Sequence, residues 1–257
     1  MKTLDKIGTY QFTAEPFHCD FSKKLFMGHL GNHLLNAADF HASDRGFGMT
    51  YLNPEHKTWV LSRLAIEMYD MPAEYTKFNV STWIEGAMKY FTHRNFRVTS
   101  AADGGKVYGY GRSIWAMIDT DSRQQADILA IKNGEITRYI DTETACPIAT
   151  PSRVKMGNAA KIATTIDTHY SDVDVNGHIN SVKYIEHVLD LFDLPWHKSH
   201  RISRLDIAYV AESYCGDKLN FYREDTAEDT VCVKITKSTP DEKEVEVCRC
   251  QVTFSPK

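Results

Sequence analysis

The chain has 257 residues, 42% of them hydrophobic and 25% charged, with a formal net charge of −4 at pH 7. This composition is ordinary for a folded protein, and no apolar stretch approaches the roughly 20 residues that a membrane-spanning helix needs. We therefore expect no membrane insertion. Because the chain is net acidic and has no stripe of lysine and arginine interleaved with aromatic residues, we also expect no nucleic-acid binding.

The first residues and the cysteines indicate the cellular compartment. Met1 to Lys6 lack the apolar segment of a signal peptide, so we expect a cytoplasmic protein. The six cysteines form no CxxC pair, and in a reducing compartment we expect them to be free thiols that hold no zinc.

The N-terminal half predicts one helix followed by strands. Apolar and small residues recur at helical spacing from Leu30 to His41. The strand-like segments that follow are residues 60–61, 78–84, 94–99 and 107–118. Asp103-Gly104-Gly105 predicts a hairpin turn between the last two of these segments.

The C-terminal third repeats this plan. An apolar run at helical spacing from Val182 to Phe192 predicts a second helix. Alternating segments follow at residues 205–210, 230–236 and 244–254, and the turn-rich residues 240–243 join the last two in an antiparallel hairpin.

The repeated order of a helix and then antiparallel hairpins predicts a duplicated unit of the α+β class. Gly28-His29-Leu30 at the first helix is echoed by Gly177-His178-Ile179 at the second. We place the domains at residues 1–145 and 157–257, with residues 146–156 as a linker that carries two prolines. We expect each domain to be a hotdog, in which an antiparallel sheet wraps a long helix and covers its apolar surface.

The residues Asp174-Val175-Asn176-Gly177-His178 stand directly before the second helix. A carboxylate, a carboxamide and an imidazole therefore lie on a turn where unpaired backbone N–H groups and the helix dipole stabilise an oxygen that gains negative charge. The combination is typical of an acyl-transfer site. Taken singly, Asn176 or Asn180 is explained as an ordinary N-cap, and His178 as a structural histidine.

Residues 172–185, which include this turn, resemble the acyl-acyl carrier protein thioesterases of plants and bacteria. Further resemblance at residues 113–119 and 207–213 extends it over nearly the whole chain in matching order. The resemblance implies two tandem hotdog domains, of which the first encloses much of the acyl chain. It also implies hydrolysis of the thioester between a fatty acyl chain and the phosphopantetheine of acyl carrier protein, without a metal or redox cofactor.

The resemblance also assigns the catalytic residues. Asp174, Asn176 and His178 occupy the Asp-x-Asn-x-His positions, and Glu212 aligns with a catalytic glutamate. Thioester hydrolysis needs a base for water and donors for the oxyanion, whereas the thiolate leaves readily. We expect Glu212 or Asp174 to be the base, while Asn176, His178 and helix-start N–H groups orient and polarise the thioester. The sequence does not divide the roles of the two carboxylates.

The chain departs from the plant pattern at two places. Ser213 follows the glutamate where plant enzymes often have a cysteine, which disfavours a covalent Cys–His mechanism. Cys215 lies on the same strand face two residues further on, so a thiol role stays open as the minor alternative. Glu186-His187 stand where plant enzymes usually have Gly-Trp.

Candidate substrate-binding residues and a histidine pair lie in the first domain. The candidates for the wall of an acyl tunnel are Leu34, Ala38, Trp83 and Trp115, with hydrophobic core as the alternative for each. His29 and His33 have the i, i+4 spacing of a metal-binding helix face. Because no HExxH arrangement accompanies them, we expect a structural role and no metal.

The function that we expect is hydrolysis of fatty acyl-acyl carrier protein by a two-domain monomer that can form a homodimer. The alternatives are a hotdog acyl-CoA thioesterase and a non-catalytic protein that binds acyl thioesters. A protein carrier would need a basic docking surface, and the basic residues near the motif in sequence are Lys183, Lys198, Arg201 and Arg204. Such clustered charges are also explained as a solvated face.

Overall fold

A computed structural model describes residues 4–102, 105–238 and 243–257 of the chain. It divides into two compact units, Met1–Thr150 and Pro151–Lys257, and the division falls inside the predicted linker 146–156. Two predicted hairpin turns, at Asp103-Gly104 and at residues 240–242, lie outside the described residues.

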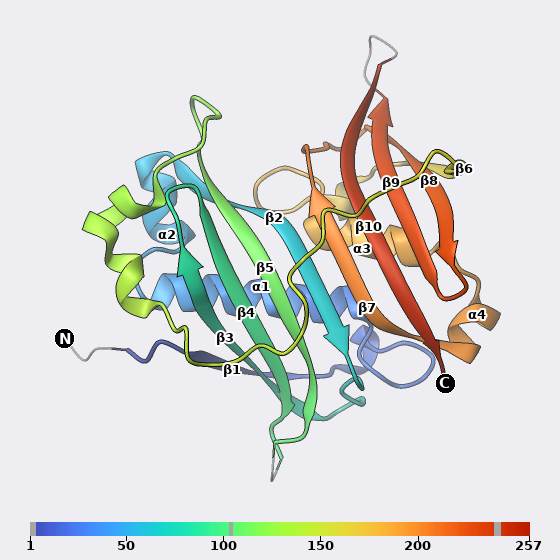
Figure 1. Ribbon diagram of the computed structural model, residues 1–257, viewed down its shortest axis with the longest axis horizontal. Coiled ribbons are helices and arrows are strands. Elements are labelled where there is room, and N and C mark those ends of the chain that lie inside the picture. Colours follow the sequence, from blue (N-terminus) through green and yellow to red (C-terminus); the bar gives the residue numbers. More distant parts are fainter. Residues whose placement is uncertain (1–3, 103–104, 239–242) are drawn as a thin grey trace. The chain divides into compact units, whose positions relative to one another are not determined.

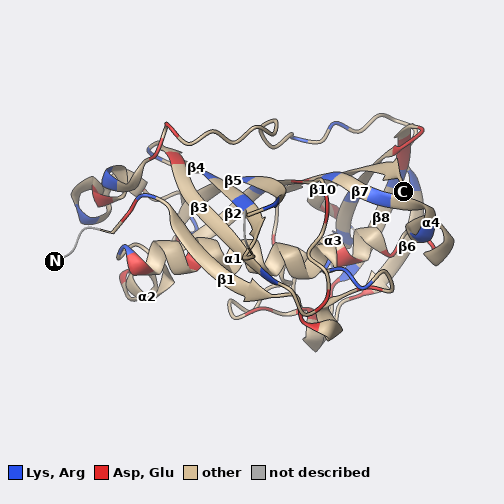
Figure 2. Ribbon diagram, turned by 90° about the horizontal axis from the view of Figure 1, so that it is seen from below, with Lys and Arg blue, Asp and Glu red and all other residues tan. Residues whose placement is uncertain are grey.

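The N-terminal unit is an antiparallel sheet with the strand order β1-β3-β4-β5-β2, and helix α1 lies along one face of it (Figures 1 and 2). Its long elements are β1 (Gly8–Thr13), α1 (Met27–Asp44), β2 (Lys57–Met68), β3 (Lys77–Ala87), β4 (Phe91–Ser100) and β5 (Val107–Asp119). Its short helices are η1 (Pro16–His18), α2 (Met49–Leu52), η2 (Asn53–Glu55) and η3 (Ile128–Tyr139), the last interrupted by non-helical backbone at residues 131–134.

Helix α1 forms where the apolar spacing predicted it. Leu30, Leu34 and Ala37 are fully buried, since the 3.6-residue period places them on the face that meets the sheet. At the end of the helix, the Arg45 side chain donates Nη1–H to the carbonyl of His41 at 3.1 Å. This bond satisfies one of the carbonyls that a helix end leaves unpaired.

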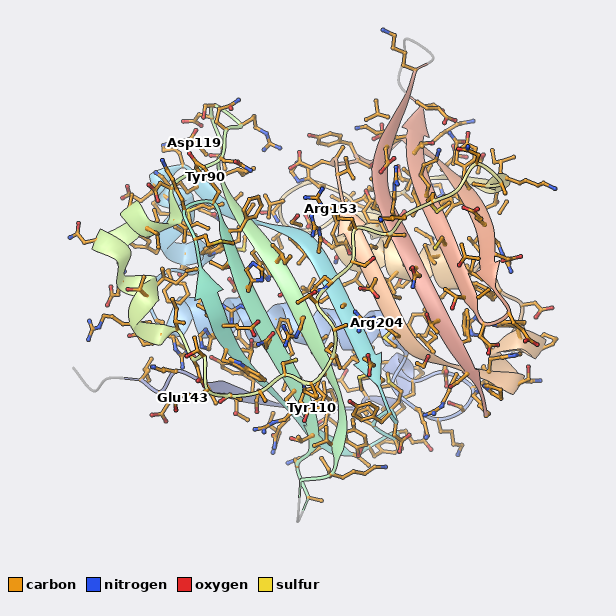
Figure 3. All side chains as sticks on the ribbon, in the orientation of Figure 1. Tyr90, Tyr110, Asp119, Glu143, Arg153 and Arg204 are labelled. Carbon is orange, nitrogen blue, oxygen red and sulfur yellow. The ribbon has the colours of Figure 1, made fainter. Side chains whose placement is uncertain are left out.

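The two faces of this sheet are both covered. Phe78 of β3 packs against the ring of His33 on α1, with 5.3 Å between ring centroids. Trp83, five positions further along β3, belongs to the opposite face, because side chains alternate along a strand. There it packs with Cys146, Ile148 and Tyr110, the last labelled on β5 in Figure 3. The first residues of the predicted linker therefore cover the outer face of the N-terminal sheet.

The C-terminal unit is a second antiparallel sheet with the order β7-β10-β9-β8-β6, and helix α3 lies on one face of it (Figures 1 and 2). Its strands are β6 (Lys161–Asp167), β7 (His200–Tyr209), β8 (Lys218–Ala227), β9 (Thr230–Ser238) and β10 (Glu244–Pro256). Its helices are η4 (Tyr170–Asp172), α3 (Ser181–Leu189) and α4 (Leu194–Ser199). The Tyr209 hydroxyl donates to the carbonyl of Ser181 at 2.7 Å and so joins β7 to the start of α3.

Helix α3 has 9 residues, against 18 in α1. It is shorter than the predicted run to Phe192 because a new helix begins nearby: Asp193 caps α4 by accepting the N–H of Trp196 at 2.8 Å, and Pro195 follows. Phe192 is still buried and packs edge-on against Phe254 of β10, at 4.7 Å between centroids. Among the described residues no helix combines the length and apolar character needed to cross a membrane.

Candidate active site

The turn before α3 is a small hairpin closed by an antiparallel bridge between Val173 and Ile179. The N–H of Asp174 donates to the carbonyl of His178 at 2.8 Å, and the N–H of Gly177 donates to the carbonyl of Asp174 at 3.0 Å. Gly177 has φ +80°, and a Cβ added there would meet nothing within 4 Å. The backbone torsion, and not lack of space, therefore requires glycine at this position.

The carboxylate of Asp174 faces the backbone of its own turn. Its Oδ1 accepts the N–H of Asn176 at 2.8 Å and, at a longer 3.4 Å, the N–H of His178. This is the local hydrogen bonding by which Asp stabilises a turn. One oxygen of Asp174 is thus committed to holding the turn that carries Asn176 and His178.

Asn180, and not Asn176, is the N-cap of α3. Its Oδ1 accepts the N–H of Val182 at 3.0 Å, so that helix-start N–H is already used and does not serve an oxyanion. Asn176 is exposed, and within the described part of the chain its carboxamide has no hydrogen-bond partner. Its NH₂ group is therefore able to donate to a substrate.

Glu212 lies in the segment that follows β7, and the structure brings it to the turn. The N–H of Ile179 donates to the carbonyl of Ser213 at 2.9 Å, which ties the two segments together. The Nε2 atom of His178 lies 3.4 Å from Oε2 of Glu212, and the two side chains are 25% and 28% exposed. The imidazole and the carboxylate are thus adjacent, and both are partly accessible to solvent.

Sequence reasoning missed two residues of this site. The Tyr214 hydroxyl donates to Oε2 of Glu212 at 3.3 Å, and its ring meets the ring of His178 edge-on at 5.1 Å. The Lys237 ammonium, on β9, donates to the carbonyl of Glu212 at 2.8 Å. Tyr214 could have been suspected from its place two residues after Glu212. Lys237 carries no signal in the sequence, since only the pairing of strands brings it here.

A buried carboxylate anchors the start of the turn. Oδ2 of Asp172 accepts the N–H of His169 at 2.8 Å, and the carbonyl of Asp172 accepts the N–H of Asn180 at 2.8 Å. His187 on α3 places Nε2 at 3.7 Å from Oδ1 of Asp172, while its neighbour Glu186 pairs with Lys183 at 2.7 Å. Glu186 and His187, which differ from the plant pattern, therefore both take part in ion pairs of α3.

The hydroxyl and thiol groups beside Glu212 differ in access. Ser213 is completely buried and Cys215 is exposed. Tyr184 of α3 is also buried, and this burial raises the pKa of its phenol well above the usual value. Ser213 is thus no surface nucleophile, and Tyr184 is not a proton donor near neutral pH.

Three of the four predicted tunnel residues lie on one side of the N-terminal sheet. Leu34 and Ala38 are buried on α1. Trp115 shares its face of β5 with Gly111, where an added Cβ would come within 3.4 Å of Leu34. Trp83 lies on the opposite, outer face. The role of these residues as a tunnel wall stays a prediction.

The N-terminal histidines form a stack near the start of α1. The rings of His18 and His29 lie 4.1 Å apart, and those of His18 and His33 lie 6.4 Å apart. Burial first, and then the nearby imidazoles of His18 and His29, lowers the pKa of His33 to about 4. In the described ranges no group of three or more His, Cys, Asp or Glu side chains is arranged to hold a metal ion.

The four basic residues considered for docking are not equivalent. Lys183 is paired with Glu186, and Arg204, labelled on β7 in Figure 3, is paired with Asp206 at 2.7 Å. Nε of Arg201 donates to the hydroxyl of Ser255 at 2.9 Å, and Lys198 lies in the last turn of α4. Figure 2 shows residues of both charge signs on this unit.

A sheet that covers one helix, repeated once along the chain, defines a tandem hotdog protein of the α+β class. The chain belongs to the acyl-ACP thioesterase family. The family model of the acyl-ACP thioesterase N-terminal domain matches residues 8–131, and that of the C-terminal domain matches residues 157–255.

Similar proteins agree with this membership. A solved acyl-ACP thioesterase from Bacteroides thetaiotaomicron is 50% identical, with a TM-score of 0.88 over 97% of this chain and 98% of that one. The 12:0-ACP thioesterase from Umbellularia californica is 18% identical and shares the fold, with a TM-score of 0.83 over 100% of both chains. The chloroplastic palmitoyl-acyl carrier protein thioesterase of Gossypium hirsutum is 28% identical over 73% of this chain and 47% of its own. The chain thus spans about half the length of such curated relatives.

Proposed function

We propose that this protein hydrolyses the thioester of fatty acyl-acyl carrier protein, which releases a free fatty acid and ends chain elongation. The observation that carries the proposal is the approach of His178 Nε2 to Glu212 Oε2, 3.4 Å apart on two segments joined by a backbone hydrogen bond. Family models that match both halves of the chain support it.

We assign the general base to Glu212, because one oxygen of Asp174 is committed to the turn. The Glu212 carboxylate takes a proton from water while the water oxygen attacks the thioester carbon. The carboxamide of Asn176 and the imidazole of His178 donate to the carbonyl oxygen as it becomes negative. When the C–S bond breaks, the proton held by Glu212 passes to the sulfur and the carboxylate is restored.

The acyl chain is assigned to the N-terminal unit. Leu34, Ala38 and Trp115 share the side of the sheet that faces α1, which supports a common wall for an apolar chain. Replacing Leu34 by Ala should then shift the preferred substrate towards longer chains, because it removes volume from that wall. An unchanged preference, together with a loss of stability of about 2–5 kcal/mol, would identify Leu34 as simple core.

Carrier docking is assigned to Lys198 and Arg201, because these two side chains are exposed, whereas Lys183 and Arg204 are half-buried. Both carrier and protein are acidic, so docking needs a local basic surface. Charge reversal at Lys198 or Arg201 should raise KM for carrier substrates, and added salt should act in the same direction by screening. Lys161→Glu on β6 is the control that changes net charge equally.

A homodimer and a cytoplasmic location remain predictions from the sequence.

The deciding experiment compares thioesters with equal chains. The purified protein is incubated with acyl carrier protein loaded with chains of graded length and with the matching acyl-CoA, and thiol release is followed. Preferential hydrolysis of the carrier substrates supports the proposal. Equal hydrolysis of acyl-CoA, with neither charge reversal changing the ratio, would favour the acyl-CoA thioesterase. Binding of the acyl carrier without thiol release would identify the non-catalytic binder.

A further inference from the structure

Tyr214 is a 46% exposed aromatic residue just beyond Glu212, and its backbone is firmly held. Its N–H donates to Oδ2 of Asp217 at 2.9 Å, and its carbonyl accepts both the hydroxyl of Thr168 at 2.8 Å and the N–H of Asp217 at 3.1 Å. These bonds close a turn and fix it to the residue that follows β6. The position of the Tyr214 side chain is thus set by structure on both sides of the turn.

The side chain of Tyr214 touches both members of the proposed catalytic pair. Its hydroxyl lies 3.3 Å from Oε2 of Glu212, the same oxygen that faces Nε2 of His178. Its ring stands at 81° to the His178 ring with centroids 5.1 Å apart, an edge-to-face arrangement that restricts rotation of the imidazole. The hydroxyl contact is long for an O–H···O bond, as catalytic hydrogen bonds often are before substrate binds.

Lys237 supports this arrangement from β9. Its ammonium donates to the carbonyl of Glu212 at 2.8 Å and lies 5.2 Å from the centroid of the Tyr214 ring. It also lies 3.4 Å from Oδ2 of Asp217, the acceptor of the Tyr214 N–H, and its side chain is only 17% exposed. One shielded cation therefore holds the backbone of Glu212, one face of Tyr214 and the turn between them.

We propose that Tyr214 is a positioning residue that holds Glu212 and His178 in the orientation the reaction needs, an inference that rests on the proposed thioester hydrolysis. The hydroxyl directs the Glu212 carboxylate through a charge-assisted hydrogen bond, and the ring sets the plane of the imidazole. Lys237 contacts both the Tyr214 ring and the backbone of Glu212 and so fixes their relative positions. Tyr214 acts through these two residues and exchanges no proton with the substrate.

Two variants separate the hydroxyl from the ring. Tyr214→Phe removes only the hydroxyl and should lower kcat about 3- to 10-fold, because a partly exposed bond to a carboxylate is lost. Tyr214→Leu also removes the ring and should lower kcat about 10- to 100-fold. The KM of acyl carrier protein should stay within about twofold in both, since Tyr214 contacts the proposed catalytic pair and is assigned no part in binding the carrier.

The matched control is Tyr222→Phe, which also removes a tyrosine hydroxyl bonded to a carboxylate of this unit, Oε1 of Glu244 at 2.6 Å. It should leave kcat unchanged. Thermal unfolding of all variants is measured beside turnover, so that loss of folded protein is subtracted from loss of rate.

A second readout needs no turnover. The edge-on ring of Tyr214 shifts the carbon-bound proton resonances of His178 in an NMR spectrum of the protein without substrate. These resonances, assigned by their disappearance in His178→Asn, should stay in place in Tyr214→Phe and move in Tyr214→Leu.

The outcomes separate this inference from the proposed function. The positioning role would be overturned if both Tyr214 variants kept the wild-type kcat. It would also be overturned if only KM changed, or if kcat fell no more than in Tyr222→Phe. A wild-type protein that releases no thiol from any acyl carrier would overturn the hydrolytic function instead. In that case, unmoved His178 resonances in Tyr214→Leu would still refute the contact on which the positioning role depends.

Discussion

The two units carry the same short sequence, Gly-His followed by an apolar residue, at the start of their helical region, and use it differently. In the N-terminal unit Gly28-His29-Leu30 already lies inside α1, and His29 stacks on His18 at 4.1 Å. In the C-terminal unit Gly177-His178-Ile179 lies in the hairpin before α3, and His178 meets Glu212 at 3.4 Å. Similar residues therefore place a histidine beside a carboxylate only where the backbone forms a turn and a carboxylate arrives from another segment.

The interiors of the units also differ. Between the N-terminal sheet and α1, Arg94 is buried and donates Nη1–H to the hydroxyl of Thr82 at 3.2 Å. Burial lowers the pKa of Arg94 to about 9 and, together with the charge of Arg94, lowers the pKa of His41 to about 2. The N-terminal unit thus buries two basic side chains, Arg94 and His41, whereas His178 and Glu212 of the C-terminal unit are partly exposed beside a turn.

The carboxylates of the C-terminal unit should give the largest effect. Glu212→Gln keeps the shape of the side chain but removes the base, so turnover should fall by about 10²–10⁴. Asp174→Asn keeps an oxygen that accepts the N–H groups of Asn176 and His178, and it should cost about tenfold or less. Steady-state thiol release measures both. A loss in Asp174→Asn as large as in Glu212→Gln would reverse the assigned roles.

The echoed histidines test the comparison directly. His178→Asn should lower turnover by about 10²-fold, the size expected when an oxyanion donor is displaced. His29→Asn, the matched variant in the N-terminal unit, should keep turnover within about twofold, since His29 packs against another ring. The same kinetic assay is used for both. Similar losses in the two variants would mean that the N-terminal copy also takes part in the reaction.

Acid stability should reveal the free-energy cost of protonating the half-buried His33 in the N-terminal unit. The pKa of His33 is lowered from 6.5 to about 4, so its stabilising contribution is complete above pH 6.5 and is lost as pH falls towards 4. His33→Leu removes this titration, so its melting temperature should fall less than that of the wild type between pH 6.5 and 4, by about a few °C.

Tryptophan fluorescence is a suitable probe of that unit, because Trp59, Trp83 and Trp115 lie in it and only Trp196 lies in the other. The exposed His56, changed to Gln, is the control and should keep the wild-type acid slope. Equal slopes for the wild type and His33→Leu would contradict the assignment.

The smallest expected effect concerns the exposed thiol beside the site. Cys215→Ala should keep nearly all activity, because the mechanism assigned to Glu212 needs no covalent intermediate. Alkylation of the wild type is the accompanying measurement. Inactivation by the alkylating reagent that disappears in Cys215→Ala would restore a thiol mechanism.

Much of the fold was predictable from periodicity, and what was missed has physical reasons. The predicted helices and the half-buried strands β2, β3, β4, β5, β7, β9 and β10 are confirmed. Strand β6 was missed because it is exposed along most of its length, so its residues do not alternate between apolar and polar. Strand β8 carries the charged residues Arg223-Glu224-Asp225 in its second half, and β1 buries only Gly8, so neither shows a clear pattern.

The candidate site was predictable where it is local in sequence. The turn from Asp174 to His178 is recognisable because its residue types and the following helix are contiguous. The position of Glu212 beside His178 came from the resemblance, since periodicity alone does not bring distant segments together. Lys237 was out of reach, because its approach to Glu212 follows from the pairing of β9 within the sheet. The division of labour between Asp174 and Glu212 depends on individual hydrogen bonds that no pattern reveals.

The turn that carries the proposed chemistry depends on a residue without a chiral centre. At φ +80° Gly177 occupies backbone space that L-amino acids rarely adopt, yet open space surrounds the place where a side chain would begin. Glycine is thus required at this position because of the backbone conformation and not because a side chain would be too large. Protein semisynthesis could place D-alanine there, and the turn should accept this mirror-image residue while L-alanine strains it. The achirality of the residue at position 177 therefore determines whether the turn can hold Asn176 and His178 close together.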